Sequence, residues 1–257
     1  MSEYREVFQR KEIKYLLDER QLSELKKYLD TFAEVDAYGL SRINNIYFDT
    51  PDFSLIRTSI EKPLYKEKLR LRTYGATSDD TNAFIEIKKK YAGIVYKRRI
   101  SGRYEDMHDY LMGDGNLQDT SQIADEIRAF KERYGELIPA MSICYDRIAM
   151  AGKYDKEFRV TFDTNIEWNA GCTDLRNIRH GKQLLKPRQY LMEIKVSNAM
   201  PVELSRKLSE LEIFPVSFSK YGAGYKEMLK ERSGAVRTIA AAQTINDYRM
   251  KGKVAYA

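Results

Sequence analysis

Charged side chains on alternate residues, with apolar residues between them, recur in four separate stretches of this chain. The stretches contain Lys66, Lys68, Arg70 and Arg72; Glu86 and Lys88; Arg159 and Asp163; and Glu193 and Lys195. Because side chains in a β-strand alternate between the two faces of a sheet, each stretch predicts a strand with one charged and one apolar face. Several such strands side by side predict a basic surface that can bind phosphate.

Strands of this kind are interleaved with a few helices. The pattern of apolar residues and turn signals predicts strands at 5–17, 42–49, 65–74, 83–91, 94–102, 141–149, 157–167 and 190–196. Helical spacing follows at 18–32 and 202–211, and a helical insertion is expected at about 104–135. We therefore expect one domain, residues 1–230, followed by a loosely ordered C-terminal tail, residues 231–257.

Composition limits the class of protein. The 43% of hydrophobic residues among 257 can build a core, and 44 basic against 38 acidic residues indicate an anionic partner only where the excess is concentrated. Two cysteines, Cys144 and Cys172, argue against a disulfide framework and are compatible with a reducing compartment, so we expect a cytoplasmic protein. No apolar stretch approaches about 18 residues and the N-terminus lacks a signal-peptide pattern, so no membrane span is predicted.

The predicted strands are too numerous for one flat sheet to hold comfortably. Closure into a barrel would remove both edges, and the predicted helices could cover an apolar outside. The alternative is an open antiparallel sheet with one solvated face. A solvated face usually mixes signs, however, and the crowding of Lys66 to Arg72 against other basic strands favours a bound anion. We expect an α+β fold with a closed antiparallel β-barrel of about eight strands, a polar lumen and helices packed outside.

Eight short motifs support this reading through their order along the chain. They are Arg10-Lys11-Glu12-Ile13-Lys14-Tyr15, Leu69-Arg70-Leu71-Arg72, Glu86-Ile87-Lys88, Lys97-Arg98-Arg99, Tyr145-Asp146-Arg147, Arg159-Val160-Thr161-Phe162-Asp163, Glu193-Ile194-Lys195 and Phe218-Ser219-Lys220-Tyr221. Each motif alone is weak, but the ordered set resembles the vacuolar transporter chaperone (VTC) domain of the triphosphate tunnel metalloenzymes. The resemblance covers roughly residues 5–230.

The resemblance implies a tunnel that binds triphosphate or inorganic polyphosphate, and a polymerase that builds polyphosphate from ATP with Mn²⁺ or Mg²⁺. The positions that match the basic lining, which binds substrate and takes part in catalysis, are Lys14, Arg70, Arg72, Lys88, Lys97, Arg147, Arg159 and Lys195. Lys220 matches a substrate-binding lysine near a tunnel mouth. Glu193 resembles the metal-coordinating glutamate, with Glu12 and Asp163 as further candidates.

Strand alternation gives independent support for part of this set. It places Arg70, Arg72, Lys88, Arg159 and Lys195 on charged faces, and it leaves Lys97 and Arg147 ambiguous because both faces of their strands are mixed. Glu86 is expected to orient Lys88 or an arginine rather than to bind metal.

One departure from the wider superfamily bears on activity. The adenylate cyclase and thiamine triphosphatase branch opens with Glu-x-Glu-x-Lys, whereas Arg10 stands at the first acidic position here. The change weakens a small-molecule triphosphatase assignment and removes one candidate metal ligand.

The chemistry leaves three functions open. Phosphoryl transfer needs mainly positioning and electrostatic stabilisation from the protein. An acceptor phosphate oxygen has a low pKa, so it needs no general base. This suits a chain with only two histidines, His108 and His180. The same tunnel could instead serve a polyphosphatase or triphosphatase, or a non-catalytic polyphosphate sensor. Nucleic acid is not an expected partner, because a recognisable pattern of aromatic stacking residues is absent.

Overall fold

The computed structural model describes residues 11–92, 94–113, 115–155, 157–197 and 199–233, so the predicted strand before residue 11 and the tail from 234 lie outside the described residues. Its elements are β1 (Lys11–Leu17), α1 (Glu19–Leu29), β2 (Ala33–Asp49), α2 (Ser54–Glu61), β3 (Tyr65–Tyr74), β4 (Asn82–Tyr91), β5 (Ile94–Arg103), α3 (Tyr104–Met112), α4 (Gln122–Tyr134), β6 (Ile138–Gly152), β7 (Arg159–Asn169), the short 3₁₀ helix Leu175–Asn177, β8 (Lys182–Gln183), β9 (Tyr190–Val196) and α5 (Val202–Glu210). Residues 220–233 form a last helix. Within this described part, no helix has the length and apolar character needed to cross a membrane.

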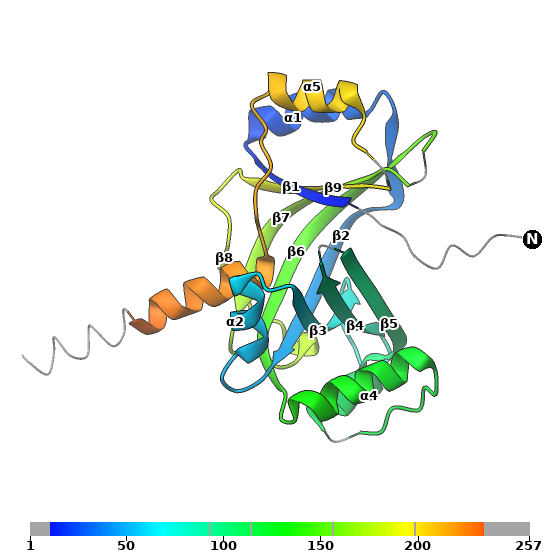
Figure 1. Ribbon diagram of the computed structural model, residues 1–257, viewed down its shortest axis with the longest axis vertical. Coiled ribbons are helices and arrows are strands. Elements are labelled where there is room, and N and C mark those ends of the chain that lie inside the picture. Colours follow the sequence, from blue (N-terminus) through cyan, green and yellow to red (C-terminus); the bar gives the residue numbers. More distant parts are fainter. Residues whose placement is uncertain (1–10, 93, 114, 156, 198, 234–257) are drawn as a thin grey trace, which may run out of the picture.

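The nine strands of the described residues belong to one antiparallel sheet (Figure 1). The strand order is β1-β9-β7-β6-β2-β3-β4-β5, with β8 paired to β7. The longest strands, β2 with 17 residues and β6 with 15, pair with each other and run through the middle of the sheet. The α+β class is therefore confirmed.

The expected closure into a barrel is wrong, because among the described residues no ladder joins the edge strands β1 and β5. The free edge of β1 is taken instead by residues 215–216. The Val216 N–H donates to the Lys14 carbonyl at 2.7 Å, and Tyr15 forms an isolated bridge with Pro215. Side chains nevertheless span the opening, since Lys88 Nζ on β4 lies 3.6 Å from Glu12 Oε2 on β1. We call the face of the sheet that these two side chains share the inner face.

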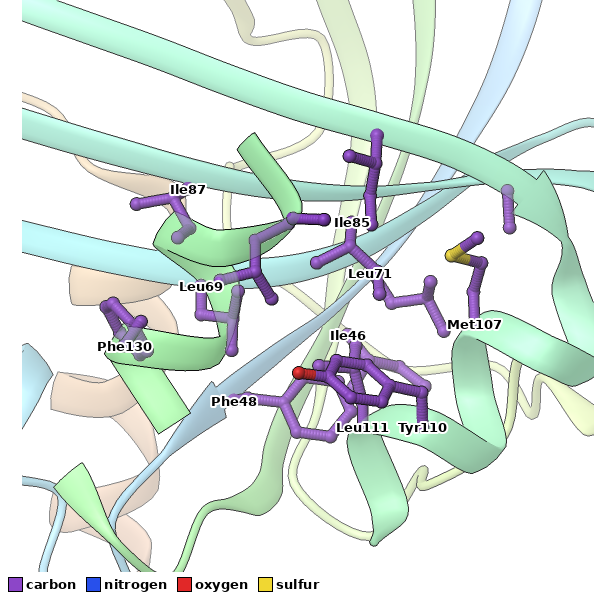
Figure 2. Packing of buried hydrophobic residues seen from close by; sticks show 14 of the residues in the cluster. Ile46, Phe48, Leu69, Leu71, Ile85, Ile87, Met107, Tyr110, Leu111 and Phe130 are labelled. Carbon is purple, nitrogen blue, oxygen red and sulfur yellow. The ribbon is translucent and has the colours of Figure 1, made fainter. Parts of the chain in front are cut away.

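One apolar cluster covers the outer face of β2 to β5 (Figure 2). Leu69 and Leu71 of β3 pack there with Ile85 and Ile87 of β4, beneath helices α3 and α4, which occupy the predicted insertion. Because neighbouring residues of a strand point to opposite faces, burying Leu69 and Leu71 outside turns Arg70 and Arg72 to the inner face.

A second cluster covers the outer face at the other end of the sheet. Met192 and Ile194 of β9 pack with Val160 of β7 beneath α1 and α5, which lie side by side over β1 and β9 in Figure 1. Helix α1 begins at a capping box in which the Asp18 carboxylate accepts from the Gln21 N–H and the Gln21 side chain accepts from the Asp18 N–H. Burial of this apolar face directs Glu193 and Lys195 inward.

A third cluster fills one end of the inner face. Tyr47 and Ile143 of the central strands pack there against Tyr221 and Tyr225 of the helix 220–233, and against α2. Figure 1 shows this last helix, in orange, beside α2. The rest of the inner face is polar and forms the candidate site.

Candidate functional site

Charged side chains from seven strands and one helix meet on the inner face. They are Glu12 and Lys14 of β1, Arg70 and Arg72 of β3, Glu86 and Lys88 of β4, Lys97 of β5, Arg147 of β6, Asp163 of β7, and Glu193 of β9, with Lys220 at the start of the helix 220–233. Ion pairs between these residues divide the site into three groups.

The first group surrounds Glu86, whose side chain is 1% exposed. Its Oε2 accepts from Arg70 Nε at 2.7 Å and lies 2.5 Å from Arg70 Nη2, while Lys97 Nζ contacts Oε1. Burial alone would raise the pKa of Glu86, but Arg70, Arg72 and Lys97 together hold it well below its usual range. Glu86 thus orients an arginine, as expected, and contacts Lys97 rather than Lys88.

Two arginines of this group are also held by neutral partners that the sequence analysis did not select. Arg70 Nη1 donates to the Tyr47 hydroxyl at 3.1 Å, and Arg72 donates to Asn45 Oδ1 at 2.8 Å and to the Tyr145 hydroxyl at 3.1 Å. Asn45 and Tyr47 alternate with outward-facing apolar residues of β2, so the same period-two pattern could have placed them on the inner face.

The second group joins two buried carboxylates to two cations. Arg147 binds both oxygens of Asp163, with Nε 2.5 Å from Oδ1 and Nη2 2.7 Å from Oδ2. Lys220 Nζ lies 2.5 Å from Asp163 Oδ2 and 3.0 Å from Glu193 Oε1. Burial would lower the pKa of Lys220, but Glu193 and Asp163 raise it above the usual range, so this lysine stays charged.

The third group lies where β1 meets β9. Lys14 Nζ is 3.4 Å from both Glu12 Oε1 and Glu193 Oε1, and it donates to the Phe218 carbonyl at 3.1 Å. Burial would raise the pKa of Glu193, yet Lys220, Lys14 and Arg147 hold it well below its usual value. Lys195 stands opposite Glu12 in the β1–β9 register, and burial lowers its pKa despite the attraction of Glu193 and Glu12.

Arg159 differs from the other predicted lining residues. Its side chain is 48% exposed and lies 3.6 Å from Asp36, and among the described contacts none ties it to the three groups. Its position is at the rim of the inner face. His108 packs on the outside, 3.0 Å from the Thr173 carbonyl, and the His180 side chain is fully exposed.

Lys66 and Lys68 extend the site beyond the predicted set. Lys68 Nζ donates to Ser219 Oγ and Lys66 Nζ to the Ser59 carbonyl, both at 3.0 Å. Burial, assisted by Lys88, Lys14 and Lys66, lowers the pKa of Lys68 to about 8 against the opposing effect of Tyr47. Both lysines line a cavity of about 790 Å³ between β1, β3, β4 and residues 216–226. Within the part of the chain that is described, neither ammonium has a carboxylate partner, so this cavity attracts anions.

A divalent cation fits only part of the predicted ligand set. Asp163 does not fit, because Arg147 and Lys220 already occupy both of its oxygens. Glu12 and Glu193 fit better. They approach the same ammonium, and Glu193 Oε2 has a single cation, Arg147, 3.6 Å away. No group of three or more His, Cys, Asp or Glu side chains placed for a metal occurs in the described residues, but Mg²⁺ commonly uses one or two carboxylates together with substrate phosphates.

Comparison with known proteins adds family and fold. The VTC domain matches residues 9–229. A candidate adenylate cyclase from Bacillus halodurans has a TM-score of 0.51 at 14% identity, over 83% of this chain and 94% of that one. A candidate adenylyl cyclase from Hippeastrum, described as having a dominant triphosphatase activity, has a TM-score of 0.49 at 15% identity, over 84% of this chain and 95% of that one. Among curated proteins no match is found.

Proposed function

Because this chain belongs to the VTC domain family, we propose that it is a metal-dependent phosphotransferase that extends inorganic polyphosphate from ATP. The observation that carries the proposal is the set of inward cations on β1, β3, β4, β5, β6 and β9, which exceeds the carboxylates available to balance it. A phosphate chain supplies the missing negative charge along the polar part of the inner face.

The arginines suit the transferred phosphoryl group. In the proposed reaction a terminal oxygen of the polyphosphate chain forms a bond to the γ-phosphorus of ATP, and the bond from that phosphorus to the bridging oxygen breaks, releasing ADP. Charge accumulates on the equatorial oxygens during this step. Neighbouring side chains fix both Arg70 and Arg72, so the N–H groups that these contacts leave over can contact those oxygens without much loss of rotamer freedom.

The lysines bind the flanking phosphates, and the acceptor needs no general base. Lys14, Lys88 and Lys220 lie around Glu12 and Glu193, where they would attract the chain on either side of the reacting group. Glu193 and Glu12 would hold Mn²⁺ or Mg²⁺, which when bound neutralises charge on the phosphate oxygens. A terminal phosphate oxygen is ionised at neutral pH, so the absence of histidine from the described inner face does not prevent transfer.

Hydrolysis by the same site is the second candidate function. Water must lose a proton to attack, and each carboxylate of the three groups, Glu12, Glu86, Asp163 and Glu193, is held by at least one cation. This pairing favours transfer to phosphate over hydrolysis. A sensor that binds phosphate chains without turnover is the third candidate.

One incubation separates the three candidates. Purified protein receives ATP with Mn²⁺ or Mg²⁺, and the products are resolved on a gel that distinguishes long polyphosphate from released phosphate. A metal-dependent long-chain product is expected. Released phosphate alone would favour the hydrolase, and binding without either product would favour the sensor. The Arg70→Glu/Arg72→Glu variant serves as the inactive preparation that excludes a contaminating enzyme.

A further inference from the structure

Tyr47 contacts both Arg70 of the site and the last helix, residues 220–233. Its hydroxyl accepts from Arg70 Nη1 at 3.1 Å, and its ring stacks on Tyr221 with a centroid distance of 4.6 Å and an interplanar angle of 15°. The Tyr221 hydroxyl donates to Asp49 Oδ2 at 2.8 Å. Tyr47 is 8% exposed, Tyr221 2% and Asp49 0%, so the whole connection is shielded from water.

Asp49, whose carboxylate is held by backbone N–H groups, anchors this connection. One oxygen of its carboxylate accepts from the Leu55 N–H at 2.9 Å and the other from the Ile56 N–H at 3.0 Å, at the beginning of α2. Tyr47 and Asp49 are two residues apart on β2 and therefore point to the same face. Tyr221 contacts both residues, because its ring stacks on Tyr47 and its hydroxyl donates to Asp49. These contacts fix the first turn of the helix 220–233 against the sheet.

The guanidinium of Arg70 is held from two sides as a result. Glu86 Oε2 accepts a hydrogen bond from Arg70 Nε and pairs with Nη2, and the Tyr47 hydroxyl accepts from Nη1. A guanidinium fixed in this way loses little rotational freedom when a phosphate binds, so more of the binding energy appears as affinity. Arg72 is held comparably by Asn45 and Tyr145. Tyr145 also contacts the last helix, since Lys220 Nζ lies 4.6 Å from the centre of its ring, but no ring stack between Tyr145 and that helix occurs in the described contacts.

We propose that Tyr47 is a positioning residue for phosphate binding: it fixes Arg70 and, through its stack on Tyr221, sets Arg70 relative to Lys220. The two cations come from distant parts of the sequence, and Lys220 directly precedes Tyr221. Together with the ion pairs of Lys220, this pair of stacked rings thus sets the spacing of two groups that would contact the same phosphate chain. The proposal rests on the proposed function, because it assumes that Arg70 and Lys220 bind phosphate.

The first test is Tyr47→Phe, which keeps the ring and removes the hydrogen bond. The Kd for inorganic triphosphate, measured by calorimetry, is expected to rise about tenfold, because a hydrogen bond to a charged group is lost. The melting temperature of the ligand-free protein should change little, since phenylalanine preserves the stack on Tyr221.

A double-mutant cycle identifies the group through which Tyr47 acts. In an Arg70→Lys background, Tyr47→Phe is expected to change the Kd by less than about twofold, because the partner of the hydroxyl is gone. Lys195→Gln provides the matched control, since no described contact joins Lys195 to Tyr47 or Arg70, and there the tenfold effect should persist. An equal loss in all three backgrounds would overturn the proposal and leave a general structural role.

A spectroscopic measurement on the wild-type protein covers the case in which Tyr47→Phe does not fold. Burial would raise the pKa of Tyr47, but Arg70, Lys68 and Arg72 lower it to about 8. Phenolate absorbance should therefore show an early ionisation step near pH 8, and bound triphosphate should shift that step upward. No shift on binding would overturn the proposal, whereas a wild-type protein that binds no triphosphate would overturn the proposed function as well.

Discussion

Asp163 is the residue that fixes two cations of the site at once. It is fully buried and binds Arg147 through both oxygens and Lys220 through one. Asp163→Asn preserves the shape but leaves only Glu193 to balance two buried cations, so the free energy of unfolding should fall by about 3–5 kcal/mol. Urea denaturation measures this loss. Asp36→Asn is the matched control, because its partner Arg159 is half exposed, and it should change stability by less than about 1 kcal/mol.

Glu193 is expected to separate turnover from binding. Glu193→Gln removes the charge that would hold a metal but keeps an oxygen that can accept from Lys220. Metal-dependent product formation should be lost, while triphosphate binding measured without metal should survive. Glu126→Gln on the outer face, where Glu126 pairs with Lys89, should leave both properties unchanged. Full activity in Glu193→Gln would exclude Glu193 as the metal ligand.

At the scale of the element, strand β3 carries cations along its inner side and apolar residues along its outer side. Reversing Arg70 and Arg72 to Glu places two carboxylates beside Glu86, so a triphosphate should no longer raise the melting temperature. In the wild-type protein the ligand should add about 2.7 kcal/mol of stability at a concentration of 100 Kd. Arg98→Glu on the outer side of β5 is the control, and its melting shift should match the wild type. A normal shift in the double reversal would show that β3 does not line the site.

At the scale of the whole molecule, the crowded and buried cations affect two properties in opposite directions as the pH rises. These are the free energy of unfolding of the ligand-free protein and its affinity for triphosphate. Burial lowers the pKa of Lys68 and of Lys97 to about 8, while in the unfolded chain these lysines keep their protons to higher pH. Tyr47, with a pKa of about 8, also loses its proton earlier in the folded state. The unfolded state thus binds more protons between about pH 8 and 10, so the free energy of unfolding should rise over this window.

Triphosphate affinity should fall over the same window, because the lysines lose the charge that attracts it. Urea denaturation and calorimetric titration from about pH 7.5 to about 9.5 measure the two trends. Stability that fell with rising pH would contradict the shared depression of these lysine pKa values.

Most of the inward cations could be predicted from sequence because alternation along a strand depends only on local geometry. Arg70 and Lys88 were assigned in this way, whereas Lys97 and Arg147 needed the register of β4 with β5 and of β6 with β7. Tyr47 was missed because a tyrosine on a strand resembles a core residue until its hydrogen-bond partner is known.

The absence of barrel closure could not be predicted, because it depends on which segment pairs with the free edge of β1. Two backbone interactions with residues 215–216, far away in the sequence, occupy that edge in place of β5. No local pattern reports such a competition between distant segments. The ion-pair partners of Asp163 have the same origin, since Arg147 and Lys220 reach it only in the folded sheet.

The opening between β1 and β4, spanned by the Glu12–Lys88 contact, also determines how a polymer can enter. A barrel whose wall is fully hydrogen-bonded is open only at its two ends, so a long chain must enter it end first. Among the described residues, side chains and not a backbone ladder connect β1 to β4, so we expect a polyphosphate to enter sideways at any point along its length. Chains blocked at both ends should then associate as fast as free chains in stopped-flow mixing. A strong dependence of the association rate on free ends would instead indicate threading.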